Sequence, residues 1–380
     1  MYKVDHFING KSSSESNKTS KIYNPSYGTE IGEVLCATNE VADKAVESAY
    51  EASKAWSKTG LIYRSELILK FRQNVINRSK EIIDLGISEA GKTRPDAEAE
   101  LDRAVQALTH IAGVQHFYPS HYSQNVAGGI DIADLRFPIG VIVGVGPFNF
   151  PILIPLLHSA MALVTGNTYI GKPSEKVPSV SRLYADIWKE SGLPDGCYNV
   201  VNGDKETVEF LVRHEKVDGL AFIGSTAAAK SLKMLGVEHN TKVQALGGAK
   251  NHMIVLPDAD LDMSADAAVS ASFGAAGQRC MAVSVVVAVG DIADELLDKI
   301  KERMPNLIMG VTDDDKTQLG PVISPENKDR IYSFIDSAEP DGATLVVDGR
   351  IRSNSLEGCF VGPTLIDNVK PGMALSLIHI

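Results

Sequence analysis

The chain has 380 residues, of which 44% are hydrophobic and 22% are charged, so it can bury a large core in two or three domains. Its formal net charge of −11 argues against a nucleic-acid partner, because phosphate binding needs clustered lysine and arginine side chains. Four widely spaced cysteines (Cys36, Cys197, Cys280 and Cys359) form no CxxC pair, so neither a disulfide framework nor a metal site is expected.

The first segment, residues 1–10, contains neither the apolar stretch of a secretion signal nor the Arg-rich pattern of a transit peptide. No apolar run along the chain is long enough to span a bilayer, so no membrane partner is expected. Together with the isolated cysteines, these features predict a reducing, intracellular location, which we take to be the cytoplasm.

The N-terminal third predicts a layer of helices. Residues 11–20 form a polar, Ser-rich segment that we interpret as a loop. Helices are expected at residues 39–56, 61–85 and 94–114, and Asn39 is a plausible N-cap of the first. Residues 1–116 are therefore assigned to the first domain, and residues 117–136 to an extended arm that leads into a sheet.

From residue 137 the pattern changes to short apolar runs that alternate with helical segments. Strands are expected at residues 141–145, 168–171, 198–201 and 219–223, and helices at 152–164, 179–191, 205–214 and 226–235. Such a βα series is typical of a parallel sheet that is covered on both faces. Residues 137–245 therefore predict an α/β domain of the Rossmann type, joined to the N-terminal helical layer.

A second α/β domain is predicted for residues 246–373. Its expected elements are a strand at 253–256, an Ala-rich helix at 263–275, a strand at 283–289 and a helix at 292–304. The last residues, 374–380, are interpreted as a non-native tail.

Three glycine-rich turns follow predicted strands, the position at which open α/β sheets bind ligands. Gly144-Val-Gly146 is only a partial dinucleotide fingerprint, because Asn149 stands where a third glycine belongs, and a simple tight turn remains an alternative. The segment from Gly166 to Pro173 nearly spells a P-loop, but Pro173 replaces the hydroxyl residue that binds magnesium, which excludes this interpretation.

The third turn, Gly224-Ser225-Thr226, is either a phosphate-binding helix N-terminus or an ordinary N-cap. Cys280 follows an Ala/Gly-rich helix and stands beside Arg279, whose charge favours a reactive thiolate. A buried structural cysteine is the alternative, because most lone cysteines behave as small hydrophobic residues.

Five segments in this order resemble motifs of the aldehyde dehydrogenase superfamily over nearly the whole chain. They are Pro147-Phe-Asn-Phe-Pro151, Lys172-Pro-Ser-Glu175, Phe222-Ile-Gly-Ser225, Leu246-Gly-Gly-Ala-Lys250 and Gly277-Gln-Arg-Cys280. The resemblance implies that Cys280 is the nucleophile and that the Asn149 amide stabilises the oxyanion.

The resemblance also implies a set of cofactor-binding residues. They are Gly146, Phe148 and Gly247 near the nicotinamide, Lys172, Glu175 and Lys176 at the adenosine ribose, and Ser225 at the pyrophosphate. Glu175 can accept a hydrogen bond from a free 2′-hydroxyl but would repel a 2′-phosphate, so the resemblance implies NAD rather than NADP.

The subfamily is inferred from the absence of a residue that could act as the general base for hydrolysis. Hydrolytic members carry a glutamate where an ungapped match places Leu246, or Ala245 if the register slips by one, and neither can activate water. The chain resembles the CoA-acylating methylmalonate-semialdehyde dehydrogenases, in which two arginines, here Arg103 and Arg279, bind the substrate carboxylate. A solvated helix charge is the alternative for Arg103.

The expected reaction is therefore oxidation of malonate or methylmalonate semialdehyde to acetyl-CoA or propionyl-CoA, with CoA as co-substrate. A hydrolytic semialdehyde dehydrogenase and an inactive NAD-binding fragment are the alternatives. The chain stops before a further glutamate motif and an oligomerisation segment that the resemblance implies, so we interpret it as a fragment of a homodimeric or homotetrameric enzyme.

Overall fold

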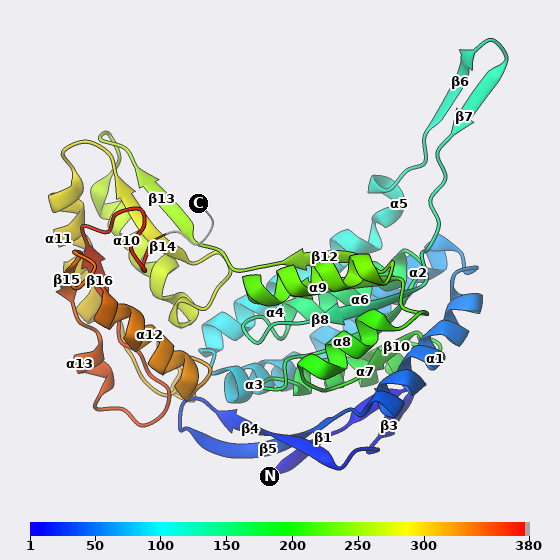
Figure 1. Ribbon diagram of the computed structural model, residues 1–380, viewed down its shortest axis with the longest axis horizontal. Coiled ribbons are helices and arrows are strands. Elements are labelled where there is room, and N and C mark those ends of the chain that lie inside the picture. The colour runs from blue at the N-terminus through cyan, green and yellow to red at the C-terminus, as the bar shows by residue number, and fades with distance from the viewer. Residues whose placement is uncertain (377–380) are drawn as a thin grey trace. The chain divides into compact units, whose positions relative to one another are not determined.

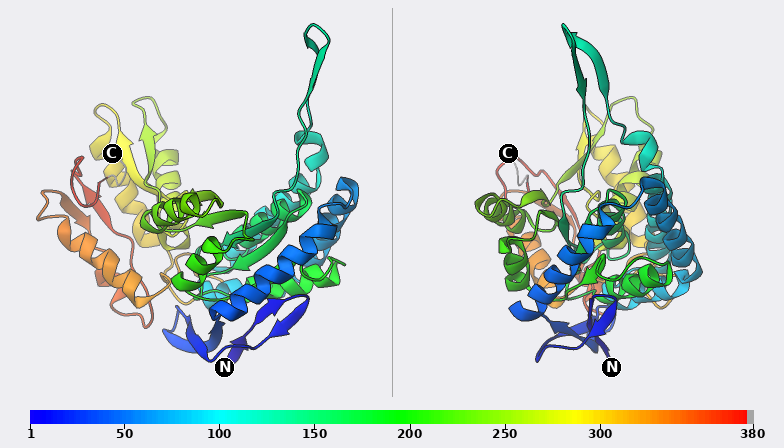
Figure 2. Two further views of the ribbon diagram at one scale, coloured as in Figure 1. Left: turned by 45° about the vertical axis from the view of Figure 1, so that its right-hand side comes forward. Right: turned by 90° about the vertical axis from the view of Figure 1, so that its right-hand side faces the viewer.

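The computed structural model describes residues 1–376, which divide into two compact units (Figures 1 and 2). The first unit comprises Met1–Ile22, Gly32–Ile83 and Ala99–Gly247. The second comprises Tyr23–Ile31, Asp84–Glu98 and the chain from Gly248 onward. Part of the predicted tail, residues 377–380, lies outside the described residues.

A seven-stranded sheet forms the centre of the first unit. Its strands follow the order β12 (Lys242–Leu246), β11 (Gly219–Ile223), β8 (Val141–Val145), β9 (Thr168–Lys172), β10 (Tyr198–Val200), β2 (His6–Ile8) and β3 (Lys11–Ser13). The first five strands run parallel, whereas β2 is antiparallel to β10 and β3 to β2. The predicted βα series is confirmed, and the edge strand β12 is an addition that the sequence pattern did not indicate.

Helices cover both faces of this sheet, as a parallel sheet requires. One face carries α1 (Asn39–Trp56), α8 (Lys205–Arg213) and α9 (Thr226–Glu238), and the other carries α2 (Leu61–Asn77), α6 (Leu153–Val164) and α7 (Ser179–Glu190) (Figure 1). Thr38, rather than Asn39, caps α1, because its side-chain oxygen accepts a hydrogen bond from the Val41 N–H. The predicted N-cap was therefore wrong by one residue.

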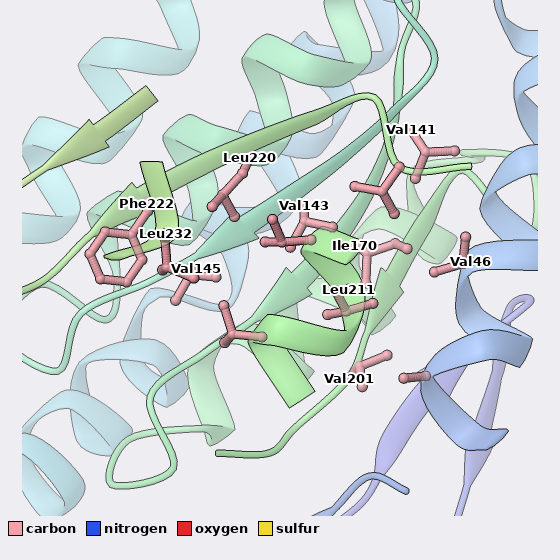
Figure 3. Packing of buried hydrophobic residues seen from close by; sticks show 14 of the residues in the cluster. Val46, Val141, Val143, Val145, Ile170, Val201, Leu211, Leu220, Phe222 and Leu232 are labelled. Atoms are coloured by element: carbon pink, nitrogen blue, oxygen red, sulfur yellow. The ribbon is translucent and has the colours of Figure 1, made fainter. Parts of the chain in front are cut away.

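The core beneath the first group of helices is built from β-branched and aliphatic side chains. Val141, Val143 and Val145 of β8 contact side chains from α1, α8 and α9, and Figure 3 shows them with Leu220 and Phe222 of β11. Because nearly every residue of β8 is buried, the strand reads as a continuous apolar run. The backbone at the ends of these strands is therefore held rigidly.

Two further expectations for the N-terminal third were wrong. The segment 11–20 is not a loop, since it contains β3 and the start of β4 (Lys18–Asn24), which lies in a small sheet of order β1 (Tyr2–Val4), β5 (Thr29–Cys36), β4. A positive φ of 50° at Asn9 and 72° at Gly10 turns β2 into β3, and this Asn-Gly pair is a hairpin signal that could have predicted the strands.

The expected helix 61–85 is two helices, because the chain leaves the helical conformation at Arg78 between α2 and α3 (Ser79–Ala90). The Arg78 guanidinium binds Glu81 and Glu190 at this break. The helices α4 (Arg94–Ala112) and α5 (Val114–Phe117) follow. No helix within residues 1–376 combines the length and the apolar character needed to cross a membrane.

The arm expected at residues 117–136 contains a hairpin of β6 (Tyr122–Ala127) and β7 (Ile130–Ala133). Every residue of both strands is exposed, and the hairpin stands away from the rest of its unit (Figure 2). Apolar side chains of the hairpin, such as Ile130 and Ile132, are thus left in contact with solvent.

The second unit contains the parallel pair β13 (Asn251–Val255) and β14 (Val283–Ala288), on which α10 (Leu261–Phe273) and α11 (Ala293–Arg303) pack. The chain continues through η1 (Gly274–Gly277), η2 (Met304–Asn306), α12 (Pro325–Ser337), β15 (Thr344–Val347), α13 (Arg350–Ser353) and β16 (Leu365–Asp367). The helix expected at 263–275 ends at Phe273, because Ala275 and Ala276 have positive φ.

Candidate active site

The carboxyl ends of four parallel strands meet at one edge of the large sheet. Val145 of β8 pairs with Lys172 of β9 on one side and Phe222 of β11 on the other, and Ile223 pairs with Leu246 of β12. The chain leaves β8 toward β9 and β10, then returns on the other side of β8 to β11 and β12, so the strand order reverses beside β8. Open α/β sheets bind ligands at such a reversal.

The turn after β8 contains two glycines with different roles. One makes room for a neighbouring side chain, and the other lies at the carboxyl edge of the sheet. A Cβ at Gly144 would lie 2.1 Å from the Tyr169 hydroxyl oxygen, so this glycine makes room for a buried ring. Gly146 is bound through its N–H to the carbonyl oxygen of Lys172 at 3.1 Å and thus lies at the edge itself. Phe148 and Asn149 are half-buried in the following loop, before α6.

Lys172 is a buried cation at the end of β9, with only 6% of its surface exposed. Burial lowers the pKa of its ammonium group, and Glu175 opposes that shift across 3.7 Å between Nζ and the carboxylate oxygen. Because this separation is longer than a close ion pair, the ammonium group retains donor capacity for hydroxyl groups. Lys176, half-buried, follows directly, and its N–H donates to the Ser174 hydroxyl at 3.3 Å.

Ser225 is the N-cap of α9, since its hydroxyl oxygen accepts a hydrogen bond from the Ala228 N–H at 3.3 Å. The capping interpretation therefore holds, and it leaves the helix N-terminus exposed at the same edge. A Cβ at Gly247 would lie 3.1 Å from Cα of Thr226, so glycine allows the end of β12 to approach this helix start. Backbone N–H groups at a helix N-terminus favour anions such as phosphate.

These features test whether the edge fits a dinucleotide. It offers a buried ammonium group beside a carboxylate for ribose hydroxyls, an exposed helix N-terminus for a pyrophosphate, and two glycines that permit close backbone approach. The predicted residues Gly146, Lys172, Glu175, Ser225 and Gly247 are thus brought to one edge, and the residues present fit such a group.

Cys280 lies in the second unit and is exposed, whereas Cys36, Cys197 and Cys359 are buried. The backbone that leads to it is left-handed at three successive residues, with φ of 51° at Ala275, 53° at Ala276 and 70° at Gly277. Each alanine in this conformation costs on the order of 1 kcal/mol or more, and such strain persists only where surrounding contacts impose it.

Polar side chains supply these contacts. The Gln278 carbonyl oxygen accepts the Ile323 N–H at 3.0 Å, and the Asn251 amide donates to the carbonyl oxygens of Cys280 and Ala282 at 2.8 and 2.9 Å. Asn251 therefore holds the main chain of the cysteine itself. Neither contact was expected from the sequence.

The two predicted substrate arginines differ in their surroundings. Arg279 forms a salt bridge with Asp96, which lies in the first turn of α4. Arg103, further along α4 and exposed, donates a hydrogen bond to Gln106 at 3.3 Å. Asp96 is a residue that sequence reasoning missed, although Thr93-Arg-Pro-Asp96 has the spacing of a capping box.

In the first unit, the carboxyl edge of the parallel sheet fits a dinucleotide, and in the second unit an exposed cysteine stands on a strained loop. Each feature by itself is typical of an α/β enzyme. The sequence profile described as the aldehyde dehydrogenase family matches residues 12–377. The chain belongs to this family. The predicted fold class and family are thereby confirmed.

Two relatives within this family are similar to the chain over most of its length. Malonate-semialdehyde dehydrogenase of Halalkalibacterium halodurans is 38% identical over 374 residues, which cover 98% of this chain and 77% of the relative. The human mitochondrial protein named methylmalonate-semialdehyde/malonate-semialdehyde dehydrogenase [acylating] is 40% identical over 97% of this chain and 70% of its own length.

Solved structures show the same fold. Methylmalonate-semialdehyde dehydrogenase from Oceanimonas doudoroffii aligns with a TM-score of 0.95 and 39% identity, over 99% of this chain and 78% of that one. A Sinorhizobium meliloti 1021 protein, assigned as a methylmalonate-semialdehyde dehydrogenase and solved in complex with NAD, also aligns with a TM-score of 0.95 at 39% identity, over 99% of this chain and 77% of that one.

Proposed function

We propose that this protein is an NAD-dependent, CoA-acylating dehydrogenase that converts malonate or methylmalonate semialdehyde to acetyl-CoA or propionyl-CoA. The relatives named above are called malonate-semialdehyde or methylmalonate-semialdehyde dehydrogenases, the human one is called acylating, and one of the similar structures contains NAD. The single observation in the chain that carries the acylating assignment is that Leu246, and not a carboxylate, ends β12.

The reaction begins at Cys280. Its thiolate attacks the aldehyde carbon, and the carbonyl electron pair moves to oxygen and forms a tetrahedral thiohemiacetal. The Asn149 side-chain amide and a backbone N–H are assigned to stabilise this oxyanion, a role worth several kcal/mol in comparable sites. Loss of hydride from the same carbon then leaves a thioester on Cys280.

The hydride acceptor is NAD, which supplies the redox chemistry when it is bound. Lys172, Glu175 and Lys176 are assigned to the adenosine ribose, Ser225 and the start of α9 to the pyrophosphate, and Gly146, Phe148 and Gly247 to the nicotinamide side. The carboxylate of Glu175 favours a free 2′-hydroxyl over a 2′-phosphate. The chain therefore selects NAD rather than NADP.

The fate of the thioester depends on residues 245 and 246. Leu246 is 51% exposed and Ala245 is half-buried, and neither side chain can accept a proton from water. The thioester therefore persists until the CoA thiolate attacks its carbonyl carbon and the Cys280 thiolate leaves. A semialdehyde that bears a carboxylate also loses CO2, and the carbanion left at the α-carbon takes up a proton from solvent, which yields the shortened acyl-CoA.

Arg103 and Arg279 are assigned to the substrate carboxylate, because guanidinium groups bind carboxylates with two parallel hydrogen bonds. Replacing either by alanine is expected to raise KM chiefly for semialdehydes that carry this group. Propanal, which lacks it, serves as the matched substrate.

Two further properties belong to the proposal. Exposed apolar side chains on the β6–β7 arm, including Ile130 and Ile132, support a homodimeric or homotetrameric full-length enzyme. A catalytic thiol that must stay reduced supports a cytoplasmic location.

The test follows NADH with and without CoA and identifies the product by mass. With CoA, steady turnover should release an acyl-CoA. Without CoA, a burst of about one NADH per active site should be followed by slow turnover, because the thioester on Cys280 accumulates. Rapid steady formation of a free acid without CoA would instead assign a hydrolytic semialdehyde dehydrogenase, and NAD binding without any burst would assign an inactive fragment.

A further inference from the structure

We propose that Asp96 is a positioning residue that holds the Cys280 loop and orients the Arg279 guanidinium toward the substrate carboxylate. This inference rests on the proposed function, because it explains how the guanidinium group of Arg279, next to the nucleophile, is held in one orientation. Asp96 and the whole Cys280 loop lie in the second unit.

The carboxylate of Asp96 joins three separate groups. Its Oδ1 accepts from Nη2 of Arg279, and its Oδ2 accepts from the Ala275 N–H at 3.2 Å and from the Thr93 hydroxyl at 3.0 Å. Only 11% of the Asp96 side chain is exposed, so water competes weakly for these bonds. Thr93, itself buried, accepts the Asp96 N–H at 3.3 Å and thereby fixes the carboxylate on α4.

The bond to Ala275 acts on the strained part of the loop. Ala275 is the first of the three left-handed residues that precede Arg279 and Cys280. Its N–H donates to the Asp96 carboxylate. A charge-assisted hydrogen bond at this point offsets part of the backbone strain, so the loop keeps one conformation.

The salt bridge to Arg279 fixes the direction in which the guanidinium group points. A Cβ at Gly274 would lie 2.6 Å from Nη1 of Arg279, so glycine allows the guanidinium to lie against the backbone on one side while Asp96 holds it on the other. One of its five N–H donors is committed to Asp96, and 38% of the Arg279 side chain remains exposed. The remaining donors can therefore bind a carboxylate in one orientation.

Two substitutions separate the two roles. Asp96→Asn retains an oxygen that accepts the Ala275 N–H but loses the charge that holds Arg279, whereas Asp96→Ala removes both contacts. In the full chain with NAD and CoA, Asp96→Asn should raise KM for methylmalonate semialdehyde about tenfold relative to KM for propanal. Its rate of Cys280 alkylation by iodoacetamide should stay within about twofold of the wild type. Asp96→Ala should show the altered KM ratio and also a changed alkylation rate.

Glu98→Gln, on the same helix and exposed, is the matched control and should change neither quantity. The Asp96→Asn change should add little in the Arg279→Ala background, because both act through one guanidinium. Full additivity in this cycle, or an unchanged or lowered KM ratio in a variant that retains the wild-type melting temperature, would overturn the inference. If the wild type itself shows no preference for the semialdehyde, the proposed function fails, and the alkylation rate of Asp96→Ala still tests the positioning of the loop.

Discussion

The carboxyl edge of the large sheet and the Cys280 loop present functional residues in two different ways. At the edge, strands β8, β9, β11 and β12 are locked by parallel ladders and by the buried cluster of Figure 3. In the loop, the backbone is left-handed and only partly buried, and it is held by side-chain hydrogen bonds to distant parts of the second unit.

The two regions use different interactions to position their functional side chains. The sheet edge is determined by topology and apolar burial, so single polar substitutions there should change ligand affinity and leave the fold intact. The loop depends on a few polar contacts, so single substitutions there should change reactivity. Each prediction below tests one side of this comparison.

The largest effect is expected in the loop. Cys280→Ala should reduce NADH formation to background, because no other side chain at this position can form the thioester. NAD affinity, measured by fluorescence titration, should remain within about twofold, since the cofactor residues belong to the sheet edge. Cys359→Ala, at a buried cysteine of the same unit, is the control and should retain activity. Dehydrogenase activity in Cys280→Ala would remove the basis of the assignment.

A smaller effect is expected after β8. Asn149→Ala should lower kcat roughly 10²-fold, as the loss of one oxyanion donor does elsewhere. The stoichiometry of Cys280 alkylation should not change, because the thiol itself is intact. Single-turnover kinetics with the semialdehyde would measure the chemical step directly. An unchanged rate for that step would contradict the oxyanion role and leave Asn149 as a loop residue.

An effect that leaves the reaction at neutral pH unchanged concerns the stability of the sheet unit at low pH. His6 of β2 is fully buried, burial lowers its pKa to about 4 from the ordinary 6.5, and its Nδ1 accepts the Asn202 N–H at 3.1 Å. Because the folded pKa lies below the unfolded value, the unfolded chain binds the proton first. The contribution is complete above pH 6.5 and is lost as pH falls toward 4.

This titration predicts a loss of unfolding free energy on the order of 3 kcal/mol across that window. Urea unfolding at several pH values would measure it. His6→Gln keeps an acceptor for the Asn202 N–H without titrating, so its pH dependence should be flatter than that of the wild type. His121→Gln, at an exposed histidine, should preserve the wild-type slope. Equal slopes for wild type and His6→Gln would exclude His6 as the group responsible.

Local pattern was sufficient for the βα series. The strands β8, β9 and β11 and the helices between them agree with the expected ranges to within about two residues, because alternating apolar runs and 3.6-residue periods are written in neighbouring positions. The motifs around Asn149, Lys172, Ser225 and Cys280 could also be identified from the sequence. Fold class, family and the absence of a base at Leu246 could therefore be predicted from the sequence by itself.

Tertiary structure decided the features that depend on distant partners. Strand β12 is short and partly polar, so only its pairing with β11 makes it a strand. The contact of Asp96 with Arg279 joins residues 183 positions apart, and no periodicity encodes such a pair. The left-handed backbone at Ala275 and Ala276 has the same origin, because alanine by itself favours a helix and only surrounding hydrogen bonds impose this turn.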